Sequence, residues 1–498
     1  MHDETVHPAA ASRPASGGEV EPVDPEGPRP DRWRILAVTL LVGFMSLLDV
    51  TIVNVAVPSI QDGLSARPST VQWVVSGYAL AFGLTLVAGG RLGDAYGRRR
   101  LMLLGLSGFV LSSAAAGLAP NAELLIVARL LQGASAGLLT PQSSGLIQQL
   151  FSGAERGKAF GYFGLTVSIA SAVGPLLGGL VIGAAGPDIG WRLLFLVNVP
   201  IGAAALVAIA RMVPGRDHDA RREHIDATGA LLLGAAVLFL LFPVVSIEAG
   251  ARLPLLLLPL VPLAAWAFVA WERRVIGKGR APLLDLALLR RLPGYANGLA
   301  VGTLYFTSFT GVFLAASVWL QTSRDVTALQ TGLILTPFAV GSAITSPIAG
   351  RLVSRIGRPL TAWALAITMV SLGLAAIVGP AAETEDLWWT LSPFLLLAGM
   401  GGGAVVAPNF TLTLAEVPPA MGGAAGGALQ TGQRIGSALG AALLMTVYQV
   451  AASTADGDTG FRLALAAAIV IMSTALVAAL VAVRTARRTV PAGSPSTS

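Results

Sequence analysis

The chain has 498 residues, of which 54% are hydrophobic and only 12% are charged, and its mean hydropathy is +0.72. Soluble globular domains carry about 25% charged residues, so this composition excludes a soluble chain and indicates a polytopic membrane protein. The absence of cysteine excludes disulfide bonds and thiol chemistry. The formal net charge of +6 comes from 33 basic and 27 acidic residues, and in a membrane protein it indicates attraction to the inner leaflet, with no nucleic-acid partner expected.

Bilayer-spanning helices need about 20 apolar residues each, and fourteen such runs follow one another along the sequence. They do not alternate polar and apolar residues, as the strands of a membrane β-barrel do. The sequence therefore predicts an all-α polytopic membrane protein made of two pseudo-symmetric six-helix bundles and an inserted two-helix hairpin. The predicted units are a disordered tail over 1–30, a first bundle over 31–212, a linker with the hairpin over 213–294, a second bundle over 295–483 and a disordered tail over 484–498.

The positive charges predict the orientation, because cytoplasmic loops of membrane proteins carry an excess of Lys and Arg. If both termini are cytoplasmic, the outer loops contain few basic residues: Arg67, Arg192, Arg252, Arg324 and Arg462. An even number of spans preserves this bias along the whole chain. We therefore expect a multi-pass protein of the cytoplasmic membrane with both termini inside.

Asp49 is an acid near the middle of the first apolar run, where a charged side chain is costly and is by default a functional hypothesis. A carboxyl in such a place can bind and release a proton when a cation stands near it. Arg129, inside the fourth run, is the candidate partner, and Gln132 follows it on the same helical face. The pair is either a proton-coupling site or a buried ion pair that fixes the first helix against the fourth.

A ten-residue motif, Gly90 to Arg99, joins the second and third runs, and a degraded copy, Gly350 to Pro359, occupies the same place in the second half. A basic, glycine-bounded loop that recurs between membrane-length helices indicates a transporter built from two related bundles. The motif is either a polar latch that opens and closes or a static topology signal.

Within this motif we expect two glycines to allow a tight turn, Arg91 to end the second helix, and Asp94 to accept hydrogen bonds from Arg98 or from backbone donors at the start of the third helix. The candidate gate residues are Gly90, Arg91, Asp94, Gly97, Arg98 and Arg99.

The fifth run contains Gly174, Pro175, Gly178 and Gly179. Gly174 and Gly178 form a small-xxx-small face that lets another helix approach closely, and Pro175 favours a kink. Packing and a role in transport are both open for this segment.

In the thirteenth run Gln430, Gln433 and Arg434 recur at helical spacing on an otherwise Ala-, Gly- and Leu-rich helix, so we expect this face to line a central cavity. A cation and amides there either orient an anionic or polar substrate or hydrogen-bond adjacent helices. Aromatic residues at i and i+4 in the ninth run offer a wall for planar molecules. The candidate cavity residues are Asn54, Gln132, Tyr305, Phe309, Asn409, Gln430, Gln433 and Arg434.

Two further segments, Leu48 to Pro58 and Arg129 to Gly133, complete a series of motifs that resembles the major facilitator superfamily and, within it, the fourteen-helix drug:proton antiporters. The resemblance covers roughly residues 33 to 483. It implies that the Gly90 to Arg99 motif helps to close the cytoplasmic side, that Asp49 and Arg129 are linked to proton coupling, and that the Gly174 to Gly179 segment marks exporters.

The resemblance implies proton-coupled export of drug-like or amphiphilic small molecules by alternating access, with antibiotic resistance as a consequence. Uptake or facilitated diffusion by the same fold remains open, and a non-transporting membrane sensor or scaffold is a further alternative. The sequence lacks a P-loop, and no nucleophile has an evident base, so we expect no enzyme, no cofactor and no metal site. The expected partners are a small amphiphilic substrate, protons and the lipid bilayer, and the monomer is expected to be functional.

Overall fold

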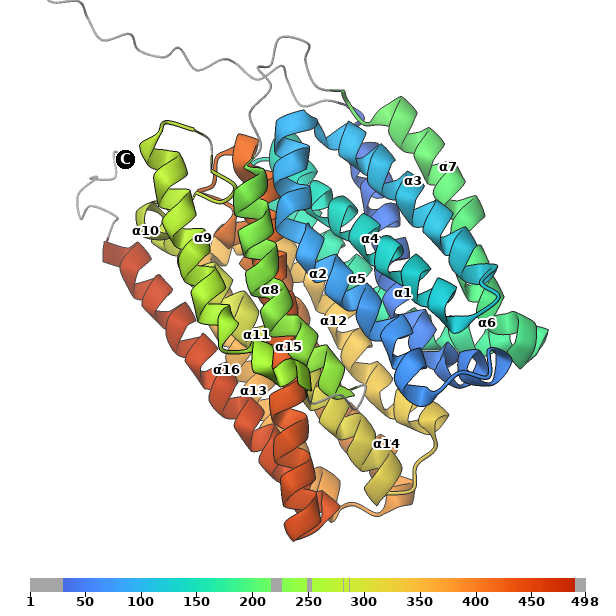
Figure 1. The fold of residues 1–498 in the computed structure, drawn as a ribbon. Coiled ribbons are helices and arrows are strands. Elements are labelled where there is room, and N and C mark those ends of the chain that lie inside the picture. The colour runs from blue at the N-terminus through green and yellow to red at the C-terminus, as the bar shows by residue number, and fades with distance from the viewer. Residues whose placement is uncertain (1–29, 216–225, 249–252, 281, 286, 489–498) are drawn as a thin grey trace, which may run out of the picture.

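The computed structural model describes residues 30–215, 226–248, 253–280, 282–285 and 287–488. Within these residues the chain is helical and has no strand, and fourteen segments are long and apolar enough to cross a membrane (Figure 1). The prediction of an all-α polytopic fold is confirmed.

The spans follow the predicted order. The first half contains α1 (Arg32–Gly63), α2 (Pro68–Tyr96), α3 (Arg98–Gly117), α4 (Ala122–Leu150), α5 (Gly153–Ala185), and α6 (Pro187–Leu196) with α7 (Asn198–Met212) as its sixth span. The inserted hairpin contains α8 (Ala227–Glu248), the 3-10 turn η1 (Leu253–Leu257) and α9 (Leu260–Gly277). After the short α10 (Ala287–Arg291), the second half contains α11 (Pro293–Ser323), α12 (Ala328–Ile356), α13 (Arg358–Ala381), η2 (Thr384–Asp386), α14 (Leu387–Thr413), η3 (Pro419–Met421), α15 (Gly422–Thr454) and α16 (Gly457–Arg488).

The predicted boundaries need one correction at the end of the second half. Helix α16 continues to Arg488, so the first residues of the predicted tail over 484–498 are helical, because nothing in that stretch breaks a helix. The rest of that tail, residues 1–29 and residues 216–225 of the linker lie outside the described part of the chain.

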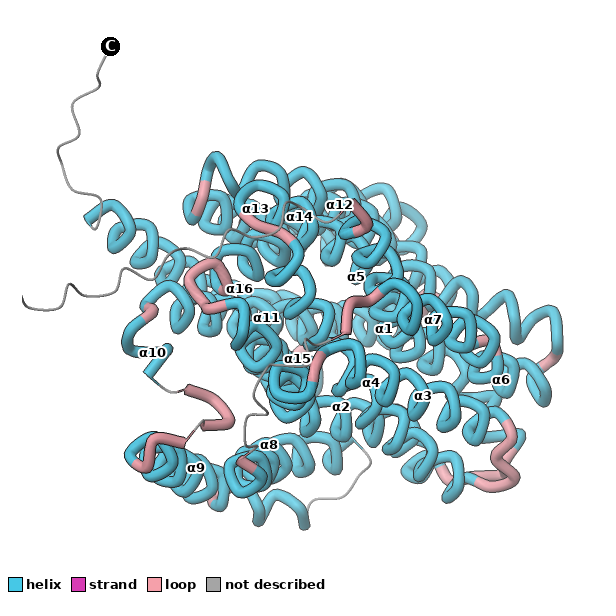
Figure 2. The backbone as a smooth tube through the Cα atoms, turned by 90° about the horizontal axis from the view of Figure 1, so that it is seen from above, coloured by secondary structure: helices cyan, strands magenta, loops and turns pink. Residues whose placement is uncertain are grey.

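Two long helix pairs join the halves. Helix α2 packs along α15, and α12 packs along α5, so each seam pairs the second helix of one half with the fifth helix of the other. Figure 2 shows the same arrangement from above, with α15 beside α2 and α5 beside α12. This exchange is expected of two repeats related by a pseudo-two-fold axis.

The first glycine of the repeated motif is a packing position in both halves, which corrects the expected turn at Gly90. A methyl group on Gly90 would stand 2.5 Å from the carbonyl carbon of Gly423, and one on Gly350 would stand 2.7 Å from Cα of Gly161. Such contacts are far shorter than packed carbons allow, so only a hydrogen fits at these two crossings.

The turn in the motif is made by one residue. Helix α2 continues through Arg91 to Tyr96, so the expectation that Arg91 ends the helix was wrong. Gly97 alone connects α2 to α3, and its φ of 97° lies in the region that favours glycine. Gly357, with φ of 70°, repeats this connection between α12 and α13.

The two halves meet at one end of the bundle and part toward the other. We call the end that carries Arg32 and Arg488 the termini end, and the opposite one the far end. On α1, Leu36 and Leu40 pack in a cluster that includes Tyr295, Phe410 and Leu429 of the second half. Asn54 and Pro58 lie on the same helical face nearer the far end and are exposed. One face of α1 is therefore covered by the second half at the termini end and uncovered beyond its middle.

The inserted hairpin lies outside one seam between the halves. Helix α8 packs against α2 and α15, and α9 packs against α8, as seen at the edge of the bundle in Figure 2. Asp226 caps α8, because its Oδ1 accepts a hydrogen bond of 2.9 Å from the Gly229 amide.

Candidate proton-coupling network and gate

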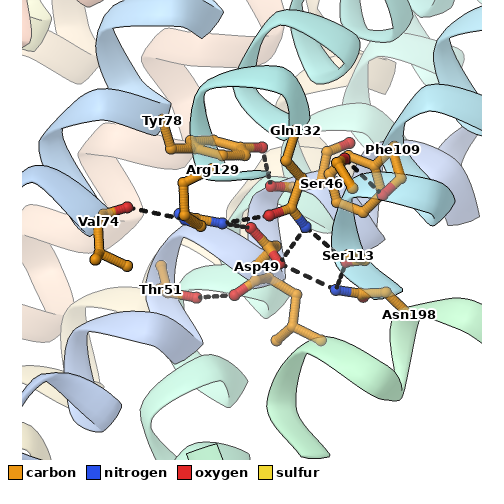
Figure 3. Close-up of polar contacts among 12 residues, drawn as sticks. Ser46, Asp49, Thr51, Val74, Tyr78, Phe109, Ser113, Arg129, Gln132 and Asn198 are labelled. Carbon is orange, nitrogen blue, oxygen red and sulfur yellow. Dashed lines mark hydrogen bonds and ion pairs between the residues drawn. The ribbon is translucent and has the colours of Figure 1, made fainter. Parts of the chain in front are cut away.

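Asp49 of α1 is buried and accepts hydrogen bonds from donors on two other helices, α4 and α7 (Figure 3). Its Oδ2 accepts a hydrogen bond and ion pair from Nη1 of Arg129 on α4. Its Oδ1 accepts from Gln132 Nε2 at 2.9 Å and from Asn198 Nδ2 at 3.0 Å. Asp49 and Arg129 are each 1% exposed, so both charges are removed from solvent and compensate each other.

Arg129 has its own set of partners, which fixes the plane of its guanidinium. Nε donates to the Val74 carbonyl at 2.9 Å, and Nη1 also donates to Gln132 Oε1 at 2.8 Å. The guanidinium carbon lies 4.2 Å from the ring centre of Tyr78 and 5.6 Å from that of Phe195. Cation–π contacts add to the ion pair where water is excluded.

The structure brings together three predicted residues, Asp49, Arg129 and Gln132, and adds others that sequence reasoning missed. Asn198 and Gln132 share the Ser113 hydroxyl as an acceptor, at 3.1 and 2.6 Å. Asn198 could have been found from the sequence, because a side-chain amide inside an apolar run is rare in a membrane span. Gln132 is fully buried in this network, so it does not line an open cavity in this conformation.

Tyr78 of α2 is the other missed member of this region. Its hydroxyl donates to the Ser46 carbonyl of α1 at 3.1 Å, and its ring covers Arg129. A tyrosine in an apolar span gives no specific signal in the sequence, because most such residues only fill the core.

Asp94 forms the contact expected of the gate, but with different backbone donors. Arg98 Nη2 donates to Asp94 Oδ1 at 2.9 Å, as predicted. The backbone donors are Gly423 N at 3.1 Å and Ala424 N at 2.8 Å, at the start of α15, and they replace the expected donors at the start of α3. Asp94 therefore acts as an N-terminal acid for a helix of the other half, where the helix dipole favours a negative charge.

Arg98 extends the same contact across the two halves. Its Nη2 also donates to the Pro419 carbonyl at 2.9 Å, and its Nη1 donates to the Gly145 carbonyl of α4. Gln148 of α4 adds a further bond between the halves, from Nε2 to the Leu414 carbonyl at 2.6 Å. These bonds lie at the termini end and hold that end closed.

The other two arginines of the motif have different surroundings. Arg99 donates to the Ala210 carbonyl at the end of α7, in the first half. Arg91 is 6% exposed within α2 and interacts electrostatically with Glu272 of α9 in the inserted hairpin.

The segment on α5 packs against α1 through the predicted glycine face. A methyl group on Gly174 would stand 2.7 Å from Thr51 Cβ, and one on Gly178 would stand 3.2 Å from the Ile52 carbonyl oxygen. Gly179 and Pro175 are exposed, and a methyl group on Gly179 would meet nothing within 4 Å. The packing role is therefore carried by Gly174 and Gly178.

The cavity candidates separate into three groups. Tyr305 is 3% exposed and stacks on Phe309 at 5.9 Å, and Asn409 is 5% exposed and donates to the Gly298 carbonyl at 3.1 Å. These three belong to the packed interior of the second half in this conformation. Asn54 is exposed on the uncovered face of α1. The third group, Gln430, Gln433 and Arg434, lies on α15, where the Arg434 guanidinium carbon is 4.6 Å from the ring centre of Phe82 on α2.

Two helical bundles that exchange seam helices, a closed end and a buried ion pair together define a polytopic transporter. A model of the Major Facilitator Superfamily matches residues 39–441, and the chain belongs to that family. The chain is therefore a multi-pass membrane protein.

Its relatives include named export and resistance proteins. The chain is 35% identical to the "Probable actinorhodin transporter" of Streptomyces coelicolor, over 89% of this chain and 80% of that one. It is also 35% identical to "Puromycin resistance protein pur8" of Streptomyces alboniger, over 92% and 93% of the two chains. The fold is similar to that of the human organic anion transporter MFSD10, with a TM-score of 0.68, 17% identity, and coverage of 91% of this chain and 100% of that one.

Proposed function

We propose that this chain is a proton-driven exporter of amphiphilic small molecules, which acts by alternating access and carries out no chemical conversion. The observation that carries the proposal is the Asp49–Arg129 pair, which is fully buried in the half that also carries the closed latch. A proton on Asp49 would remove the charge that Arg129 compensates, and the pair would separate. Protons and substrate then drive each other if they favour different states of the two halves.

The direction of transport is supported by the names of the relatives, several of which are antibiotic transport or resistance proteins. We propose that this chain likewise exports such compounds from the cell, with puromycin and actinorhodin as first substrates to test. Both halves of the pathway belong to one chain, so the monomer suffices.

We further propose that the termini end faces the cytoplasm in the cytoplasmic membrane. The loop arginines support this orientation, because Arg98, Arg99, Arg351 and Arg358 lie at the termini end. In this orientation the uncovered face of α1 lies toward the outside, and we propose that a proton enters and substrate leaves there. The chain lacks cysteine, so single cysteines at positions 100 and 453 can be labelled from either side of intact cells to test the orientation.

The proposal is tested with the purified chain in proteoliposomes under an imposed pH gradient. Efflux of rhodamine 123, fluorescein and puromycin is compared for the wild type, Asp49→Asn and Asp62→Asn, an exposed acid on the same helix that serves as the control. We expect gradient-dependent efflux in the wild type and control, and loss of the gradient dependence in Asp49→Asn. Wild-type efflux that ignores the gradient would contradict proton coupling.

A further inference from the structure

Arg434 is a cation inside a membrane-spanning helix that has no acidic partner. Among the described residues it makes no ion pair and no hydrogen bond, and its recorded contact is with the ring of Phe82. It stands twelve residues after Gly422 at the start of α15, a rise of about 18 Å, so it lies beyond the reach of lipid headgroups at the termini end. An uncompensated charge at such depth is costly and marks a functional position.

Gln430, one helical turn before Arg434, is a second hydrogen-bond donor without an acceptor. Gln430 is 6% exposed, and its Nε2 has no hydrogen-bond partner among the described residues. Gln430 and Arg434 are at i and i+4, so they share one helical face. That face points to the first half, because Gly427 of the same face approaches the Leu86 carbonyl of α2.

The hydroxyl of Thr431, next to Gln430, also lacks a hydrogen-bond partner. Thr431 Oγ1 is buried without a hydrogen-bond partner within the described chain. Buried polar groups in proteins are nearly always paired. Two buried polar groups without partners, next to the half-buried cation of Arg434, therefore indicate that a partner from outside the chain completes them. A guanidinium and an amide N–H both donate, so the partner is an acceptor, and the guanidinium favours a negative one.

We propose, on the basis of the proposed export function, that Arg434 and Gln430 bind an anionic oxygen group, a carboxylate or phenolate, of the transported amphiphile. The site lies on the seam between the halves and close to the proton site. Phe82, under Arg434, is stacked on Tyr78 at 6.1 Å with an angle of 9° between rings, and Tyr78 covers Arg129. Two rings of α2 thus separate the substrate charge from the Asp49–Arg129 pair.

The test uses two xanthene dyes of similar shape and opposite charge, fluorescein as the anion and rhodamine 123 as the cation. Binding to the full-length chain in detergent is measured by fluorescence anisotropy for the wild type, Arg434→Gln, Arg434→Lys and Arg462→Gln, an exposed arginine that controls for net charge. We expect Arg434→Gln to weaken fluorescein binding by about tenfold or more, since a charge-assisted hydrogen bond is lost. Rhodamine 123 binding should not weaken, Arg434→Lys should retain most of the affinity for fluorescein, and Arg462→Gln should change neither dye.

An equal loss of both dyes in Arg434→Gln would overturn the inference, because it would show a structural role. If that variant does not fold, Gln430→Leu replaces it, and we expect about threefold to tenfold weaker binding of fluorescein alone. Wild-type protein that exports rhodamine 123 under a pH gradient without binding fluorescein would contradict the anion site and leave the export function standing. Failure to move either dye or puromycin would instead contradict the export function.

Discussion

Arg129 of α4 and Arg434 of α15 are both cations deep in membrane-spanning helices, one in each half, yet their surroundings differ. Arg129 has an acid, a backbone carbonyl and an amide oxygen as acceptors. Arg434 has an aromatic ring as its recorded contact. In the sequence both are a charged residue inside an apolar run, so the sequence does not distinguish them. The number of acceptors within the protein does: the network of Arg129 is complete, and Arg434 needs a partner from outside the chain.

This difference predicts effects of very different size on stability when either arginine is replaced by glutamine. Arg129→Gln leaves Asp49 buried without its cation and should lower the free energy of unfolding by about 3–5 kcal/mol. Arg434→Gln removes a cation–π contact and relieves an uncompensated charge, so the change should stay within about 1 kcal/mol. Thermal unfolding in detergent, followed by circular dichroism, measures both.

The double substitution Asp49→Asn with Arg129→Gln is the control for this prediction. It removes both charges, so it should recover most of the stability lost in Arg129→Gln while proton-coupled transport remains absent. Equal destabilisation by Arg129→Gln and Arg434→Gln would show that the number of acceptors around each arginine does not determine the loss of stability.

A second comparison concerns the seams, where glycines at the termini end have no room for a side chain. Gly90→Val should clash with the Gly423 and Ala424 backbone and disfavour the closed termini end by about 1–3 kcal/mol. Spin labels on cysteines introduced at exposed positions 100 and 420 should report a longer distance across this end. Gly183→Val is the matched control, since a methyl group on Gly183 meets nothing within 4 Å, and an unchanged distance in Gly90→Val would contradict the prediction.

The latch at Asp94 should contribute less than this steric barrier. Asp94→Asn replaces an acceptor of three N–H donors by an amide that offers one oxygen, so we expect the closed termini end to weaken by about 1–2 kcal/mol. The same spin-label pair measures the shift. Ser354→Asn, at the corresponding and exposed position of the second half, should leave the distance distribution unchanged; a similar shift in both variants would argue against a latch at Asp94.

Much of the fold could be predicted from the sequence, because each membrane span is a local signal about 20 residues long. The order and positions of the fourteen spans and the Asp49–Arg129–Gln132 contact followed from composition and from charges inside apolar runs. The role of Gly90 could not be predicted, because its neighbour Gly423 lies in the other half and no local pattern connects them. For the same reason the backbone donors to Asp94 were expected from α3, the next helix in sequence, and were found in α15.

The smallest change in stability is expected for a substitution at Glu272 of α9. Like Arg434 it lacks some hydrogen-bond partners, but its charge is negative. Its side chain is fully buried, Oε1 accepts from the Leu283 amide at 3.2 Å, and Oε2 has no partner among the described residues. Unlike Arg434, it lies on the outer hairpin, so we expect no substrate there. The Glu272 charge is repelled by Asp226 and attracted, more weakly, by Arg91 of α2. Glu272→Gln keeps the Leu283 bond and removes this buried charge, which should raise the unfolding temperature by an amount equivalent to about 1 kcal/mol. A lower unfolding temperature would mean that the charge itself stabilises the hairpin against α2.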